Sequence, residues 1–165
     1  MKKKLSLLLA VWILIGMLAG CGLSVPRPEI KKSEFAFSVT YELGGEVKTI
    51  SGVYVCEYDG VSWSLEGGYR RAWKGYIKDG TTEEQIKLAT ASDGGIVELN
   101  LYFDPNYFMG DSYRKSDEPF MPQMSVRLED KEGLTFESNA DLIAETYGAR
   151  VISYEYDDPI ENTFQ

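Results

Sequence analysis

The stretch Phe35-Ala36-Phe37-Ser38-Val39-Thr40-Tyr41-Glu42-Leu43 decides the fold class of this chain. Apolar side chains occupy every second position from Phe35 to Leu43, and small or polar residues lie between them. Successive side chains of a β-strand point to opposite faces, so this alternation predicts a strand with one buried face. Sheets with one covered and one solvated face are typically antiparallel. We therefore expect this stretch to be part of an antiparallel sheet.

The same pattern continues toward the C-terminus, and turn sequences interrupt it. Gly44-Gly45, Asp59-Gly60 and Asp93-Gly94-Gly95 have the composition of hairpin turns. Strand signals at intervals of roughly 8–14 residues are typical of an antiparallel sandwich or barrel. We expect an all-β domain, an antiparallel β-sandwich or flattened barrel, with one short helix near residues 138–147. Further strands are expected at 47–58, 61–65, 69–78, 86–90, 97–103, 124–128 and 150–156.

The N-terminus has the pattern of a secretory signal peptide. Three lysines precede an apolar run from Leu5 to Leu18, and the run ends in Leu18-Ala19-Gly20-Cys21. This run has 14 residues, whereas a helix needs about 20 to span a bilayer. The last four residues resemble the lipobox of bacterial lipoproteins, in which the cysteine is joined to diacylglycerol. A short uncleaved anchor is the alternative interpretation.

This interpretation of the N-terminus divides the chain into three segments. Residues 1–20 are expected to be a lipoprotein signal peptide, residues 21–32 a lipidated tether, and residues 33–165 a single β-rich extracytoplasmic domain. Cys21 is then the lipidation site, and the protein is expected on the outer face of the cell membrane, held by its lipid. Two acyl chains give stable anchoring where one is marginal.

The acidic composition disfavours nucleic acid as a partner. The chain has 17 basic and 26 acidic residues, a formal net charge of −9. Removal of residues 1–20 takes away three lysines, which leaves 14 basic residues and a charge of −12. Such a surface repels phosphate backbones. It also disfavours docking on anionic lipid by anything other than the acyl anchor.

The chain contains no histidine, which excludes Ser-His-Asp and Cys-His catalysis and the usual imidazole zinc sites. Cys56 lies in an expected strand, where a free cysteine usually acts as a small buried hydrophobe. Asp104-Pro105-Asn106 does not match a calcium loop and is better explained as a turn. We therefore expect no enzyme activity, no metal and no cofactor. Carboxylate chemistry stays open, although the acidic residues at 155–161 are better explained as a solvated tail.

Two regions supply candidate ligand-binding residues. The first is the aromatic stretch 63–76, where rings could stack on sugars or, alternatively, fill the core. The second is the segment 104–122, which has no period and is expected to be a long loop, a kind of segment that is often functional. The candidates are Trp63, Tyr69, Arg71, Trp73, Tyr107 and Phe108.

The chain resembles small uncharacterised lipoproteins of Gram-positive anaerobic bacteria. The resemblance runs from about Pro28 to the C-terminus and rests on residues 35–43, on Val53-Tyr54-Val55-Cys56-Glu57-Tyr58-Asp59-Gly60 and on Trp73-Lys74-Gly75-Tyr76. It implies that the protein lies on the outer face of the membrane of a monoderm bacterium, a cell with a single membrane. It implies no substrate and no site residues.

Three functions follow from these observations. The first is a non-catalytic lipoprotein that binds another protein, with residues 104–122 as the presented loop. The second is a carbohydrate or cell-wall binding module that uses the aromatic residues at 63–76. The third is a carboxylate-based hydrolase, which requires two carboxyl groups facing each other across a cleft.

Replacement of Cys21 tests the lipid anchor. We expect Cys21→Ala to abolish incorporation of a labelled fatty acid, because the thiol that carries the diacylglycerol is removed. Labelling in growing cells and detergent partitioning measure the effect. A Cys21→Ala protein that partitions into detergent like the wild type would contradict the lipoprotein interpretation.

Overall fold

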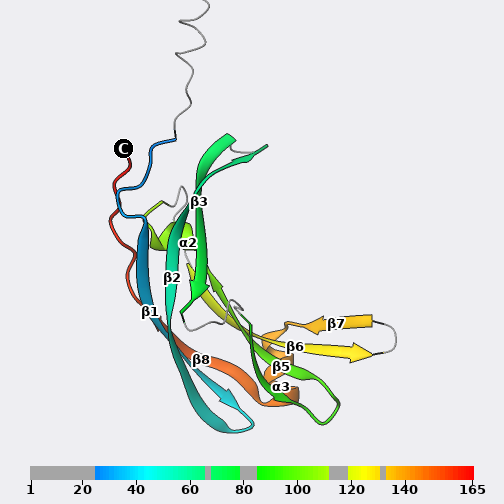
Figure 1. The fold of residues 1–165 in the computed structure, drawn as a ribbon. Helices are drawn as coiled ribbons and strands as arrows, with labels where there is room; N and C mark the ends of the chain where they lie inside the picture. Colours follow the sequence, from blue (N-terminus) through cyan, green and yellow to red (C-terminus); the bar gives the residue numbers. More distant parts are fainter. Residues whose placement is uncertain (1–24, 66–67, 79–84, 112–118, 131–132) are drawn as a thin grey trace, which may run out of the picture.

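Two antiparallel sheets make up most of the structure, a computed structural model that describes residues 25–65, 68–78, 85–111, 119–130 and 133–165 (Figure 1). Within these ranges the first sheet has the strand order β3-β2-β1-β8 and the second has the order β4-β5-β6-β7. The predicted all-β class, an antiparallel sandwich or flattened barrel, is confirmed. The strands are β1 (Lys32–Leu43), β2 (Glu46–Ser64), β3 (Gly68–Ile77), β4 (Gln85–Thr90), β5 (Ile96–Phe103), β6 (Phe120–Asp130), β7 (Gly133–Glu137) and β8 (Ala149–Tyr156).

Strand β1 buries the face that its alternation predicts. Phe35, Phe37, Val39 and Tyr41 are all buried, and the residues between them are exposed or partly exposed. The Gly44-Gly45 turn joins β1 to β2, and both glycines have positive φ, as a two-residue hairpin turn requires. Strand β2 lies between β3 and β1.

Aromatic rings from both sheets form the centre of the core. The ring of Tyr54 on β2 stacks on that of Phe103 on β5, with centroids 4.0 Å apart. Phe103 stacks in turn on Phe120 of β6 at 4.3 Å. Phe37 of β1 meets both of these phenylalanines at 5.2 and 5.7 Å. These contacts bind the two sheets together through large apolar surfaces.

Strand β5 buries polar side chains that its sequence pattern assigns to the solvent. Glu98 is buried and accepts hydrogen bonds from Gln85 of β4 and Arg127 of β6, at 2.8 and 3.2 Å. Asn100 donates to the Ser125 hydroxyl at 2.7 Å. Each buried polar group is paired with a neighbouring strand, so burial of this face does not leave an unsatisfied group.

The prediction of a hairpin turn at Asp59-Gly60 is wrong. Strand β2 continues through these residues, and the register with β3 shifts between Tyr58 and Val61. Gly60 has a φ of 93°. This glycine therefore serves a β-bulge and not the hairpin turn that the composition suggested. The hairpin closes further along, between Ser64 and Gly68.

The described part of segment 104–122 is not a presented loop. Its first residues form the short helix α2 (Pro105–Phe108), which Asp104 caps by accepting the Asn106 amide hydrogen at 3.0 Å, and its last residues begin β6. Phe108 and Met109 are fully buried, and Phe108 packs on Phe35 with ring centroids 4.9 Å apart. Phe108 and Met109 therefore fill the core and are not presented to a partner. Residues 112–118 lie outside the described ranges.

The expected helix at 138–147 is present as α3 (Ala140–Tyr147). Asn139 caps it by accepting the amide hydrogens of Asp141 and Leu142. Gly148 ends it in the left-handed conformation, with a φ of 60°. Strand β7 was missed by the sequence interpretation. No helix within the described ranges is long and apolar enough to span a membrane.

A substitution at Gly75 tests the packing of the first sheet. A β-carbon built on Gly75 would overlap the hydroxyl and ring of Tyr54, which is itself buried. We expect Gly75→Ala to lower the free energy of unfolding by about 1–3 kcal/mol, the usual cost of overpacking. Urea denaturation measures it. Lys74→Ala is the matched control, because Lys74 is the exposed neighbour on the same strand. Equal midpoints for the two variants would contradict this packing.

Candidate functional site

A buried ion pair joins β3 to the chain that follows α2. Arg71 and Asp111 have side-chain exposures of only 8% and 3%. The Arg71 Nε donates to Asp111 Oδ2 at 2.7 Å, and its Nη2 donates to Oδ1. The guanidinium therefore binds the carboxylate through both oxygens, the strongest geometry that such a pair adopts.

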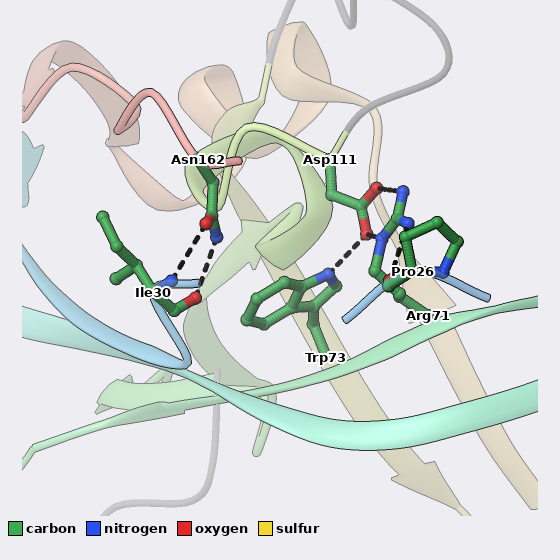
Figure 2. A network of polar contacts seen from close by, with 6 residues as sticks. All are labelled: Pro26, Ile30, Arg71, Trp73, Asp111 and Asn162. Atoms are coloured by element: carbon green, nitrogen blue, oxygen red, sulfur yellow. Dashed lines mark hydrogen bonds and ion pairs between the residues drawn. The ribbon is translucent and has the colours of Figure 1, made fainter. Parts of the chain in front are cut away.

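Three further groups complete the surroundings of this pair. The indole Nε1 of Trp73 donates to Asp111 Oδ2 at 2.7 Å, and Arg71 Nη1 donates to the main-chain carbonyl of Pro26 at 3.1 Å (Figure 2). The ring of Phe164 lies 3.9 Å from the centre of the guanidinium, within cation–π distance. Strand β3, the chain after α2, the N-terminal segment and the C-terminal tail thus meet at one charge pair.

The N-terminal segment and the C-terminal tail also pair directly with each other. Arg27 and Gln165 exchange main-chain hydrogen bonds of 2.7 and 2.9 Å, and the Glu29 amide donates to Thr163 at 2.9 Å. The Asn162 side chain accepts from the Ile30 amide at 3.0 Å and donates to the Ile30 carbonyl at 2.8 Å (Figure 2).

The expected tether is consequently bound to the domain over its described part. Pro26 hydrogen-bonds to Arg71, and Arg27, Glu29 and Ile30 hydrogen-bond to the tail, so only the residues before them remain as a link to Cys21. The tail is not simply a solvated acidic end either. Asp157 accepts the Ala36 amide hydrogen at 2.7 Å, and Ile160 donates to the Phe108 carbonyl at 3.0 Å.

The end of the β2–β3 hairpin exposes a group of apolar residues, Val61, Trp63, Leu65 and Tyr69, which we call the hairpin tip. Leu65 is 90% exposed, and Trp63 and Tyr69 are 59% and 57% exposed. Trp63 lies directly opposite Tyr69 in the antiparallel register. Directly opposite residues share one face of a sheet, so the two rings project from the same side.

A cleft of about 390 Å³ opens at the other end of β1. Its lining is part apolar and part polar. The Tyr147 hydroxyl donates to the Asp93 carboxylate at 2.9 Å. The Gly95 amide and this hydroxyl lower the pKa of Asp93, and the bond to Asp93 raises the pKa of Tyr147. The volume falls within the range of small-ligand pockets. The lining residues are Leu43, Gly44, Ala89, Ala91, Ser92, Asp93, Val97, Thr146 and Tyr147.

The structure separates the predicted ligand-binding residues into two groups. Trp63 and Tyr69 lie exposed on the hairpin tip and stay available to a ligand. Arg71 and Trp73 are bound to Asp111, so both stabilise the fold and neither is a free binding group. For Arg71 the ligand role is therefore corrected to a structural one.

The two candidates on α2 are less accessible. Phe108 is fully buried in the core, which corrects its assignment as a ligand contact. Tyr107 is partly buried, and its ring lies edge-on to Phe108 with centroids 5.6 Å apart.

Cys56 is buried, as its strand context predicts. Burial raises the pKa of its thiol to about 12, so at neutral pH the sulfur is a protonated thiol and not a nucleophilic thiolate. Among the residues that the structure describes, no three Asp, Glu or Cys side chains group as a metal site. The sequence interpretation missed Asp111, Asn162 and Phe164. Only the choice of Arg71 and Trp73 as candidates pointed toward this region.

Comparison of the chain with protein-family models, with curated proteins and with solved structures finds no match. The resemblance to small bacterial lipoproteins therefore stays a prediction.

Removal of the Asp111 charge tests the role of the ion pair. We expect Asp111→Asn to lower the free energy of unfolding by about 3–5 kcal/mol, because it leaves the Arg71 guanidinium buried without a counter-charge. Urea denaturation measures the loss. Glu34→Gln, which removes a half-exposed partner of Lys78, is the control and should cost about 1 kcal/mol or less. Similar losses for the two variants would show that the buried pair has no special weight.

Proposed function

We propose that this chain is a membrane-anchored extracytoplasmic lipoprotein that acts as a non-catalytic binding module for another protein. The proposal combines the Lys-rich leader and the lipobox-like Leu18-Ala19-Gly20-Cys21 with the path of the chain just after them. Its strongest support is the hydrogen bond from Arg71 to the Pro26 carbonyl. That bond fixes the chain to the domain only five residues after Cys21.

The short link limits how far the domain can lie from the membrane. Five residues span at most about 18 Å when fully extended. A lipid on Cys21 would thus hold the Pro26 end of the domain against the bilayer surface. The cleft at Asp93 and Tyr147 is lined by Leu43 and Gly44, at the opposite end of β1, and would then face away from the membrane.

The cleft is the surface that we assign to a protein partner. Leu43, Ala89 and Val97 give the cleft an apolar part, and Asp93 and Tyr147 add a hydrogen-bonded polar pair. This lining suits one aromatic or apolar side chain inserted from a partner, in the way that anchor residues fill pockets at protein interfaces. The buried thiol of Cys56 and the absence of histidine from the sequence support a binding role over a catalytic one.

A cell-wall glycan is the second candidate partner. The observation that favours it is the exposed cross-strand pair of Trp63 and Tyr69, since flat aromatic surfaces stack on sugar rings. This site lies on the hairpin tip and not in the cleft, so the two functions can be tested separately.

Site-specific photo-crosslinking in intact cells tests the protein-binding function. A photoreactive amino acid at Ser92, on the rim of the cleft, is expected to capture one discrete protein. The same group at Lys74, an exposed position on β3, is the matched control and should not capture it. Ala91→Trp is expected to abolish the capture, because an indole at this lining position fills the cleft.

Two outcomes would contradict the assignment. Capture from Ser92 no stronger than capture from Lys74 would remove the cleft as a partner site. Capture that persists in an Ala91→Trp protein with an unchanged urea midpoint would show that the partner contacts the rim without using the cleft.

A further inference from the structure

The hairpin tip is amphipathic. Val61, Trp63 and Tyr69 share the face on which Arg71 points toward the N-terminal segment, because Val61 pairs with Arg71 and Trp63 with Tyr69. The opposite face carries Ser62, Ser64 and Arg70. There the Arg70 guanidinium donates to the Ser64 hydroxyl at 2.9 Å. One face is thus apolar and exposed, and the other is polar.

The apolar face lies beside the point where the chain leads back to Cys21. Arg71 binds the Pro26 carbonyl, and Tyr69 is two residues from Arg71, about 7 Å along the strand. Figure 1 shows the end of the β2–β3 hairpin at the same end of the molecule as the blue N-terminal segment and the C-terminus. The hairpin tip and the start of the described chain therefore face the same surroundings.

We infer that the hairpin tip docks into the interfacial layer of the lipid bilayer to which Cys21 anchors the chain. The inference rests on the proposed lipid anchor. With at most about 18 Å of chain between Cys21 and Pro26, the anchored domain cannot move its Pro26 end away from the bilayer. The exposed rings of Trp63 and Tyr69, at the same end of the molecule, then lie within reach of the headgroups.

The chemistry of the hairpin tip suits this layer. Tryptophan and tyrosine concentrate at membrane interfaces, where an apolar ring and a polar N–H or O–H meet both environments. Leu65, at 90% exposure, adds an apolar side chain at the end of β2. The domain is acidic, so docking depends on these side chains and not on attraction to anionic lipid. The anchor raises their effective concentration at the surface, so weak individual contacts suffice.

Quenching of tryptophan fluorescence by brominated lipid tests this docking. The full lipidated protein is reconstituted on phosphatidylcholine vesicles, with or without bromine near the headgroup end of the acyl chains. Vesicle flotation measures anchoring in the same samples. We expect the wild-type protein to float and to lose emission in brominated vesicles. Trp63→Phe is expected to float equally and to lose this quenching, whereas Trp73→Phe keeps it because Trp63 remains.

Each other outcome overturns a defined part of the account. Flotation with equal quenching in the wild type and Trp63→Phe would overturn tip docking and leave the lipid anchor intact. Failure of the wild-type protein to float, in the same way as Cys21→Ala, would overturn the anchor itself. Recovery of the Trp63 emission on addition of soluble cell-wall glycan fragments would assign the hairpin tip to a glycan instead.

Discussion

The buried ion pair between Arg71 and Asp111 is the interaction on which the rest of this structure depends. Charges removed from water are costly unless their remaining donors and acceptors are satisfied. Here Trp73, the Pro26 carbonyl and the Phe164 ring supply those contacts. Each of them belongs to a different part of the chain. The pair can therefore be buried only when β3, α2, the N-terminal segment and the C-terminal tail are all in place.

This requirement determines which parts of the surface are available for function. Arg71 and Asn162 hold the N-terminal segment against the domain. A lipid on Cys21 would therefore keep the protein at the membrane and also decide that the Pro26 end of the domain lies against it. The aromatic residues divide accordingly. Trp73 donates a hydrogen bond to the ion pair, and Phe108 packs in the core. Trp63 and Tyr69 lie on the hairpin tip and stay exposed.

Alternating apolar residues predicted the fold class and most of the strands, because burial of one sheet face leaves a local signature in Phe35 to Leu43. Local turn chemistry was less informative. A glycine with positive φ serves a bulge as well as a hairpin, so Gly60 could not be assigned from sequence. The ion pair was not predictable, because its partners are 40 residues apart and no period links them. The lack of a period in segment 104–122 predicted a presented loop. Only the tertiary contacts, such as that of Phe108 with Phe35, show that α2 packs into the core.

Native-state hydrogen exchange tests most directly whether the ion pair holds the two ends of the chain. In Arg71→Met, the amides of Arg27, Glu29 and Gln165 are predicted to lose protection together, while the amides of β1 and β5 keep theirs. Such a pattern would show that the terminal segments depend on the Arg71 guanidinium for their position. Unchanged protection at these three amides in a folded Arg71→Met protein would contradict the account.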